Sequence, residues 1–305
     1  MKVSVILNCL NSTEYLREAI DSVYSQSYTD WEIILWDNAS TEDVQGFLTG
    51  YDERLHYYRA DNTVNLGEAR NLAISKAQGD FIAFLDCDDI WMPEKLQECL
   101  ACFADPEVGL VYTNWTNFNS SGYNKLTYDG ISPPEGWVFE KILFNNFTCL
   151  STLIFRTEIV RNDHIKFDSQ FTYLEDTDFL ILVARKWKFA YVSESLTNYR
   201  MHAASASATK VEGFRKEMEV LINKFSALYP EVAEKFADQL RAVNRKDSAM
   251  DNWRKGHRKR ARSLIYRDLI INPRYLLIYL AMFMPYNYID WIRQKLFRRS
   301  IGYYH

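Results

Sequence analysis

The chain has 305 residues, of which 48% are hydrophobic and 25% are charged, and its formal net charge at pH 7 is -4. This balance is typical of a soluble globular protein and excludes a chain without a packed core. The length is sufficient for one large domain with an appendage, or for two modest domains.

The cysteines and the first residues both predict a reducing, cytosolic compartment. Five cysteines, an odd number in a long chain, do not form a disulfide framework, and the pair Cys99 and Cys102 lacks the further ligands of a zinc or redox centre. The opening MKVSVILNCLN contains one lysine and an apolar run too short for a signal peptide, so we interpret it as a first strand.

The first 85 residues alternate between strands and helices. Strands are predicted at Lys2–Leu7, Trp31–Trp36, Leu55–Arg59 and Phe81–Leu85. Helices are predicted over residues 15–23, near Glu42–Leu48 and over Glu68–Ala77. Because continuous apolar strands separated by helices are typical of parallel sheets covered on both faces, the sequence predicts an α/β fold.

Polar residues follow three of these strands. Asn8–Asn11, Asp37–Ser40 and Asp86–Asp89 each begin where a strand ends. Right-handed crossovers place the carboxyl ends of parallel strands on one edge of the sheet, where open α/β sheets bind their ligands. We therefore expect the three segments to meet at one crevice. No G-x-G-x-x-G motif follows the first strand, so the usual dinucleotide fingerprint is absent.

Three carboxylates crowd the end of the strand in 80-DFIAFLDCDDIW-91. Crowded carboxylates repel one another, and burial makes their charged forms costlier. Three interpretations stay open: the acids are solvated, Asp89 caps the helix that begins near Pro93, or at least two acids share a divalent cation. In an extended chain Asp86 and Asp88 lie on the same side, which suits a cation beside a ribose hydroxyl.

Two side chains from other segments suit a nucleotide at this edge. Asp37 ends the second strand and can accept the imide N–H of a uracil or thymine. Arg70 lies near the start of a helix, after Asn65-x-Gly67, within reach of a nucleotide or its phosphates. No glycine-rich phosphate loop is present, so we expect a metal ion to offset most of the diphosphate charge.

The remaining sequence predicts a mixed region followed by helices. Residues 90–205 contain a predicted helix, Pro93–Phe103, and predicted strands at Gly109–Thr113 and Thr152–Phe155. From about Lys210 the pattern is helical, with a break at Asn272-Pro273. The acidic segment 174-LEDTDF-179 precedes a predicted helix, Phe179–Arg185, and the helix dipole alone explains one of its three acids.

Four spaced motifs carry a resemblance to a known family. The strings VSVILNCLNSTEYLREAIDSVYSQSYTDWEIILWDNAST and NLGEARNLAISKAQGDFIAFLDCDD closely resemble family two glycosyltransferases with the GT-A fold, and the resemblance covers about residues 2–205. It implies a Rossmann-like, mostly parallel central sheet flanked by helices. We expect a catalytic domain over residues 1–208, with a donor half of about 1–105 and an acceptor half of about 106–208, and a basic helical extension over residues 209–305.

In this family the strand ends hold a nucleotide-sugar donor. The resemblance implies donor binding by Asn8, Leu10, Asn11, Glu14, Asp37, Asn65, Arg70, Asp86, Cys87 and Asp88. It implies contact of Asp86 with ribose and of Asp88 with a Mn²⁺ or Mg²⁺ ion on the diphosphate. The further candidate metal ligands are Asp86 and His202, with Arg200 in support.

The chain departs from the family at the first strand end. Asn8-Cys9-Leu10-Asn11 stands where Pro-Thr-Tyr-Asn is common, so Leu10 removes an aromatic ring that stacks on the base. Asn38 also replaces a common second aspartate.

The resemblance also implies the catalytic groups and inversion of the anomeric carbon. Asp176, the second acid of the Glu175-Asp176 pair, is implied as the base that deprotonates the acceptor hydroxyl. Glu175 is the alternative base or an orienting partner, and Asp178 is expected to support the start of the helix. Acceptors in this family lie where this chain has Trp115, Asn117 and 145-NNFTCLST-152.

The C-terminal region is strongly basic. Residues 241–305 contain 15 Lys and Arg against 4 Asp and Glu, whereas the first 240 residues carry a net charge of -15. Residues 254–299 combine a dense cationic run with an apolar, aromatic stretch about half as long as the ~20 residues of a membrane span. This pattern suits an anionic membrane surface. The alternatives are a helical subdomain packed on the catalytic body and a homo-oligomer interface; nucleic acid is not expected, because no binding motif is present.

The sequence therefore predicts an inverting, metal-dependent glycosyltransferase. We expect a UDP-sugar donor and a glycan or lipid-linked glycan acceptor of bacterial surface polysaccharide, at the cytoplasmic face of the inner membrane. A nucleotidyltransferase would carry a glycine-rich, basic loop after the first strand, and Asn8–Thr13 has neither glycine nor a basic residue. The alternative is a catalytically weak or non-catalytic sugar-nucleotide-binding or assembly protein, whose signature would be missing acids. The four acids expected of an active site are all present: Asp37, Asp86, Asp88 and Asp176.

Overall fold

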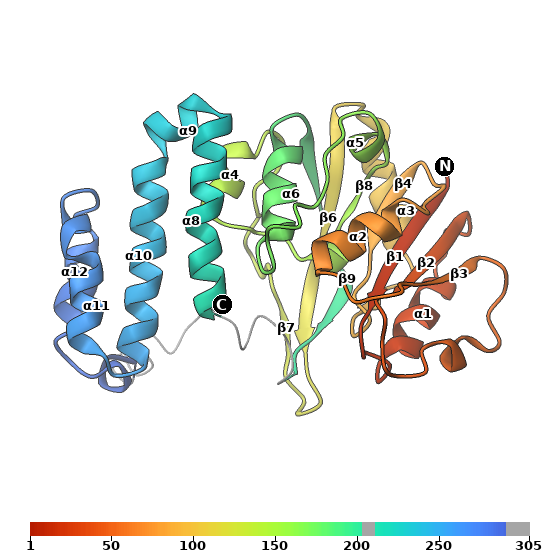
Figure 1. Ribbon diagram of the computed structural model, residues 1–305, viewed down its shortest axis with the longest axis horizontal. Coiled ribbons are helices and arrows are strands. Elements are labelled where there is room, and N and C mark those ends of the chain that lie inside the picture. The colour runs from red at the N-terminus through yellow and green to blue at the C-terminus, as the bar shows by residue number, and fades with distance from the viewer. Residues whose placement is uncertain (203–210, 291–305) are drawn as a thin grey trace. The chain divides into compact units, whose positions relative to one another are not determined.

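The computed structural model describes residues 1–202 and 211–290. The chain forms two compact units, Met1–Thr209 and Lys210–His305. The first unit is an α/β domain and the second is helical (Figure 1). Each unit buries a hydrophobic core of its own.

Four parallel strands form the first half of the sheet. They are β1 (Val3–Cys9), β2 (Trp31–Asp37), β3 (Leu55–Arg59) and β4 (Phe81–Phe84), in the order β3-β2-β1-β4. The register places Val3 opposite Trp31 on one side and Phe81 on the other. Strands β1, β2 and β4 are almost entirely buried, as continuous apolar strands require. The predicted α/β class and the four parallel strands are confirmed.

The second half of the sheet mixes parallel and antiparallel pairs. Beyond β4 follow β8 (Ile154–Arg156), β6 (Val108–Phe118), β9 (Lys188–Arg200) and β5 (Ile90–Trp91), and β7 (Asn124–Leu126) pairs with β6. Strand β8 is antiparallel to both of its neighbours, whereas β6 and β9 are parallel. The strand predicted at Thr152–Phe155 begins later, because Leu150–Thr152 form a 3-10 turn.

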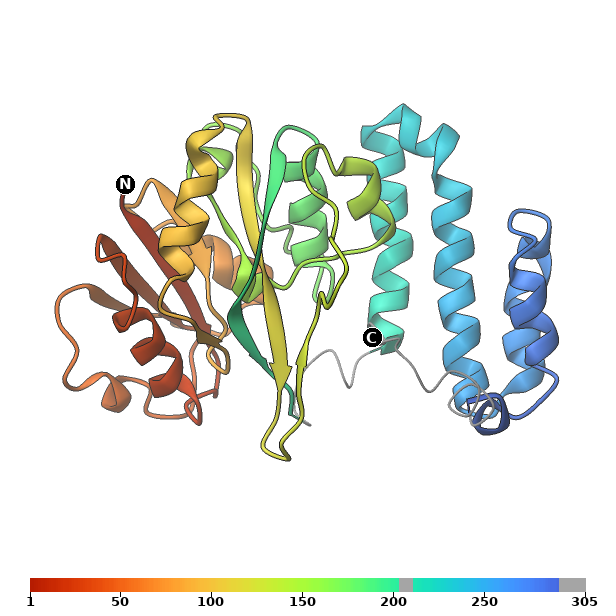
Figure 2. The same ribbon diagram turned by 180° about the vertical axis from the view of Figure 1, so that it is seen from behind.

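Helices cover both faces of this sheet (Figure 1 and Figure 2). Helices α1 (Leu16–Tyr24) and α3 (Lys95–Ala101) share one core with the β1 residues Val3, Val5 and Leu7. Helices α2 (Leu66–Ile74) and α6 (Glu175–Ala184) lie on the opposite face, where Phe155 contacts Phe84 and Phe179. The shorter elements are α4 (Phe139–Phe144), α5 (Glu158–Arg161) and 3-10 turns at Gln45–Leu48, Cys102–Ala104 and Leu150–Thr152.

Two predicted helices differ in the structure. The helix expected near Glu42–Leu48 is only a 3-10 turn, before which the Asp43 carboxylate accepts from the backbone N–H of Gly46 at 3.0 Å. The helix expected at Phe179–Arg185 already begins at Glu175. Its three acids therefore stand inside the first turn, where negative charge interacts favourably with the helix dipole.

The second unit is a set of helices joined by short turns. They are α8 (Val211–Leu228), α9 (Pro230–Lys235), α10 (Ala237–Arg254), α11 (Arg258–Ile265), a 3-10 turn at Tyr266–Leu269 and α12 (Tyr275–Ala281). Trp253, Ile265 and Met282 belong to its core. The predicted break at Asn272-Pro273 separates the 3-10 turn from α12. Within residues 1–202 and 211–290, no helix combines the length and the apolar character that crossing a bilayer requires.

Candidate active site

Three polar strand ends meet at the predicted edge of the sheet. The backbone N–H of Asn11 donates to Oγ of Ser40 at 3.0 Å, and its side-chain oxygen accepts from the backbone N–H of Thr41 at 2.8 Å. These bonds join the ends of β1 and β2. Sγ of Cys87 donates to the backbone oxygen of Asn8 at 3.3 Å, which joins β1 to the loop after β4. The predicted convergence of the three segments is confirmed.

Asp37 lies fully buried at the end of β2. Its carboxylate accepts from the backbone N–H of Ser40 at 2.8 Å, from the Tyr57 hydroxyl at 2.8 Å and from the Arg59 guanidinium. Burial alone raises the pKa of Asp37, but the hydrogen bonds and the charge of Arg59 outweigh it and lower the pKa. Arg59 was not predicted as a site residue, although it ends β3 at the same edge of the sheet, where the strand-end rule that located Asp37 also applies.

The acidic loop, residues 86–89, is anchored to two neighbouring segments. The backbone N–H of Asp86 donates to Oγ of Ser151 at 3.0 Å. Asp89 is buried, and its Oδ1 accepts from the backbone N–H of Arg200 at 2.9 Å. The interpretation of Asp89 as a helix cap is wrong, because its carboxylate binds β9 and α3 starts without a side-chain cap. Asp89 therefore holds the loop in place.

Asp88 of this loop forms a pair with His202. Nε2 of His202 lies 2.8 Å from Oδ2 of Asp88, and the two side chains are 30% and 32% exposed. Nε of Arg200 donates to the backbone oxygen of Asp88 at 2.8 Å, and its Nη2 pairs with Glu18 at 2.9 Å. The Arg200 guanidinium also lies 4.0 Å from the centre of the Tyr15 ring. Arg200 therefore fixes the backbone that carries Asp88.

Arg70 and Glu175 form a buried ion pair beside the acidic loop. Nη1 of Arg70 lies 2.6 Å from Oε1 of Glu175, and the side chains are 7% and 6% exposed. Burial raises the pKa of Glu175 to about 7; Arg70 opposes this rise and the charge of Asp176 adds to it. Burial also raises the pKa of Asp86 to about 6, again against Arg70 and with Asp88 and Asp176 adding. Arg70 is thus the shared counter-ion of two acids.

Asp176 is partly exposed in the first turn of α6. Its Oδ2 accepts from Nδ2 of Asn146 at 3.3 Å and its Oδ1 from Oγ1 of Thr177 at 3.1 Å. The Asn146 oxygen accepts from the backbone N–H of Thr148 at 3.0 Å, so the amide has a fixed orientation. Burial is the main cause of the raised pKa of Asp86, and the charge of Asp176 contributes to it, so the two carboxyl groups lie near one another. A carboxylate with neutral partners and partial exposure remains available as a proton acceptor.

The remaining predicted donor residues differ in their exposure and in their hydrogen bonds. Leu10 is 44% exposed at the end of β1, and Glu14 is exposed in the loop that follows. In the described part of the chain, Nδ2 of Asn8 is buried without a hydrogen-bond partner. Asn65 caps α2 by accepting from the backbone N–H of Glu68 at 2.8 Å. Leu10 and Glu14 are therefore accessible to a ligand, whereas Asn65 already has a structural partner.

Two of the predicted acceptor residues already have partners within the protein. Trp115 is 9% exposed and contacts Tyr128 edge to face, with ring centres 5.5 Å apart. Nδ2 of Asn117 donates to Oγ1 of Thr127 at 2.6 Å. Of the predicted acceptor positions, the 145–152 stretch contacts Asp176, the predicted base, through Asn146.

The predicted metal ligands are only partly brought together. Asp88 and His202 are in contact. Among residues 1–202 and 211–290, however, no three His, Cys, Asp or Glu side chains are grouped as a metal site. Asp86 lies near enough to Asp88 that, after burial, the charge of Asp88 adds to the rise in the pKa of Asp86.

The first four strands and the acidic loop fall inside a known family model. Residues 4–162, more than half of the chain, match the model described as Glycosyl transferase family 2. The chain belongs to this family. The family resemblance predicted from the sequence is thereby confirmed, and the glycosyltransferase family 2 assignment covers β1 to α5 of the first unit.

Curated relatives of this family 2 glycosyltransferase are named as bacterial glycosyltransferases. TuaG of Bacillus subtilis, whose name associates it with teichuronic acid biosynthesis, is 29% identical over 224 residues, covering 70% of this chain and 84% of TuaG. WfgD of Escherichia coli is 25% identical over 223 residues, covering 72% of this chain and 85% of WfgD. Its name is UDP-Glc:alpha-D-GlcNAc-diphosphoundecaprenol beta-1,3-glucosyltransferase.

Crystal structures of TarS from S. aureus share the fold. The complex of TarS 1-349 with UDP-GlcNAc superposes with a TM-score of 0.65 at 21% identity, covering 81% of this chain and 72% of that chain. The complex with UDP gives a TM-score of 0.65 at 18% identity, covering 99% and 94%. At this identity the likeness establishes the GT-A fold of this family 2 glycosyltransferase.

Proposed function

We propose that this chain transfers a sugar, with inversion, from a UDP-sugar to a hydroxyl group of a glycan acceptor in bacterial surface polysaccharide synthesis. One observation carries the proposal: the strand ends that bear Asp37 and the acidic loop are joined by hydrogen bonds, and the partly exposed Asp176 lies near enough for its charge to act on Asp86 of that loop. The name of WfgD includes UDP-Glc, and the TarS complex contains UDP-GlcNAc. The acceptor of WfgD is lipid-linked by its name, which supports a glycan on a lipid carrier at the cytoplasmic face of the inner membrane.

The donor is proposed to lie along the three strand ends. Its base would rest beside Leu10 and Asp37, and its ribose beside Asp86. Asn8, Asn11, Glu14, Asn65, Arg70, Cys87 and Asp88 complete the proposed donor site. The structural bonds of Asn11, Asn65 and Arg70 support a role in shaping this site rather than in contacting the ligand directly.

Asp176 is proposed as the general base. Its carboxylate takes the proton of the acceptor hydroxyl while that oxygen bonds to the anomeric carbon, and the bond from this carbon to the diphosphate oxygen breaks on the opposite face. Glu175 suits this role less well, because it is buried and one of its oxygens is bound to Arg70. We assign Glu175 to positioning α6.

A divalent cation fits the acids of the loop. Asp88 offers a partly exposed oxygen next to the imidazole of His202, a combination that Mn²⁺ accepts. Burial raises the pKa of Asp86, which supports a further positive charge beside this acid in the proposed site. Asp88 and His202, with Asp86 beside them, would therefore hold Mn²⁺ or Mg²⁺. When bound, the ion would neutralise charge on the leaving diphosphate.

Substitution of the proposed base tests this function. Asp176→Asn should lower kcat about 10²–10⁴-fold, because general base catalysis is worth that much, and should leave donor affinity nearly unchanged. Turnover of UDP-sugars with a suitable acceptor and calorimetric titration of the donor measure the two effects. Loss of donor binding in the variant would contradict the role of Asp176. Donor binding without any turnover by the unmodified chain would instead support a non-catalytic sugar-nucleotide-binding protein.

A further inference from the structure

The outer face of α12 and the segment after it are apolar and exposed. The exposed side chains are Leu276 (48%), Leu277 (76%), Leu280 (54%), Phe283 (54%) and Met284 (48%). Their spacing follows the helical repeat, and the opposite side of the same helix packs into the core of the unit through Ile278, Tyr279 and Met282. A helix that is apolar on all sides is normally covered on all sides. This face is therefore expected to have a partner.

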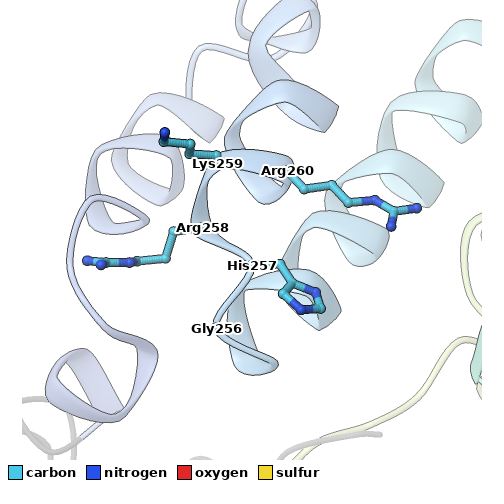
Figure 3. Close-up of a pocket in the computed structure, with 5 residues that line it drawn as sticks. All are labelled: Gly256, His257, Arg258, Lys259 and Arg260. Atoms are coloured by element: carbon cyan, nitrogen blue, oxygen red, sulfur yellow. The ribbon is translucent and has the colours of Figure 1, made fainter.

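Exposed cations adjoin this apolar face. His257, Arg258, Lys259 and Arg260 line an open hollow at the turn into α11, with Arg258 and Lys259 directed away from Arg260 (Figure 3). Nη1 of Arg258 donates to the backbone oxygen of Phe283 at 3.0 Å. The cationic turn and the end of the apolar face are thus in direct contact.

A second arginine strengthens this junction. The guanidinium of Arg262 lies 4.0 Å from the centre of the Phe283 ring, and its Nη1 donates to the backbone oxygen of Met282 at 3.0 Å. Apolar and cationic groups therefore form one continuous surface. We name it the basic-apolar surface and define it by residues 256–262 and 276–284.

We propose that the basic-apolar surface docks on an anionic lipid bilayer. Apolar side chains enter the acyl boundary of a bilayer while adjacent lysines and arginines contact the anionic headgroups, and this surface presents both. A second copy of the chain would bring the same cations together at a symmetric interface, which like-charge repulsion opposes. A nucleic acid would neutralise the cations but leave Leu277 and Leu280 uncovered.

The proposed docking rests on the proposed function, because a membrane surface would supply a lipid-linked acceptor to the transferase. It is carried by residues of the second unit, whereas the donor site lies in the first. Residues 291–299, the end of the segment predicted to contact membrane, lie outside the described residues.

Vesicle sedimentation of the full chain tests the proposal. The probes are vesicles of phosphatidylcholine alone and of phosphatidylcholine with phosphatidylglycerol. The variants are Arg258→Glu/Lys259→Glu and Leu277→Glu/Leu280→Glu, each expected to lower the partition onto anionic vesicles at least tenfold. The matched controls are Lys235→Glu, an exposed cation of α9, and Ile131→Glu, a 62% exposed apolar residue of the first unit. Circular dichroism verifies that every variant is folded.

The unmodified chain is expected to bind anionic vesicles, to bind neutral ones far less, and to be released by salt, while both controls behave like it. Equal binding to the two vesicle types, no binding, or unchanged binding of both surface variants would overturn the proposal. So would dimerisation without vesicles that Leu277→Glu/Leu280→Glu abolishes, since it would identify a second copy as the partner. Donor turnover measured without vesicles should be the same in all variants. Its absence from the unmodified chain would contradict the proposed function alone.

Discussion

Asn146 is a neutral side chain whose position determines the orientation of a charged one. It donates to Asp176 from one end of its amide and accepts from the backbone of Thr148 at the other. Asn146→Ala should lower kcat about ten- to a hundredfold, because a misplaced base loses its alignment with the acceptor hydroxyl. The donor KM should change little. Steady-state kinetics measure both, and Asn145→Ala, at an exposed neighbouring position, is the control; an unchanged kcat would exclude the role.

Lys95 is a buried cation outside the site. It is fully buried, donates to the backbone oxygen of Thr152 at 2.9 Å, and burial lowers its pKa to about 8 from 10.5. Between these values the unfolded chain holds a proton that the folded chain has released, so the free energy of unfolding rises with pH. The rise should approach about 3 kcal/mol, at 1.36 kcal/mol per pKa unit.

Urea unfolding at pH 7 to 10.5 measures this effect against Lys95→Met. The variant has no titrating group at the position, so the difference in unfolding free energy between the two proteins should shift in favour of the unmodified chain as pH rises. A difference that stays constant with pH would show that Lys95 keeps its ordinary pKa.

Individual residues were predictable where a strand end located them. Asp37, Asp86 and Asp88 follow apolar strands, and the edge of a parallel sheet brings such positions together. Asn146 follows no strand and reaches Asp176 only through a contact over 30 residues. The sequence predicted Arg70 within reach of a nucleotide or its phosphates but did not predict its pair with Glu175, a buried carboxylate that requires a counter-ion.

At the scale of elements, the Arg70–Glu175 pair connects α2 with α6. Removing one partner leaves an uncompensated buried charge, so Arg70→Met should destabilise the protein by about 3–5 kcal/mol. The double variant Arg70→Met/Glu175→Gln should recover part of this loss, because the remaining side chains are neutral. Urea unfolding of the unmodified chain, of Arg70→Met, of Glu175→Gln and of the double variant measures the coupling, and purely additive effects of the single substitutions would contradict it.

The first four strands were predictable and β9 was not, for a reason of periodicity. Strands β1, β2 and β4 are buried on both faces and read as continuous apolar runs. Strand β9 carries polar residues in its middle, and its pairing with β6 shifts register near Thr113 and Asn114. A shift of this kind interrupts the alternation on which strand prediction depends.

At the scale of the whole molecule, the two units have separate cores. The core around β1, α1 and α3 lies within the first unit, and the core around Trp253 lies within the second. We predict that a fragment of residues 1–209 unfolds in one cooperative transition and binds UDP with nearly the affinity of the full chain. Urea unfolding and calorimetry test this, with the full chain as control. A fragment without a cooperative transition would show that the predicted domain division is wrong.

In the proposed donor site, the bonds around Asp37 would affect how a pyrimidine is recognised. The Asp37 carboxylate is fully buried, and Ser40, Tyr57 and Arg59 occupy three of its about four acceptor sites. In the proposed donor site, a ring N–H is therefore expected to reach Asp37 by displacing one of these donors. Arg59, whose side chain is 47% exposed, is the donor freest to swing aside. Nucleobase selectivity would then depend on the new hydrogen-bond acceptor of the displaced Arg59 guanidinium. The ring carbonyls of uracil are suitable acceptors.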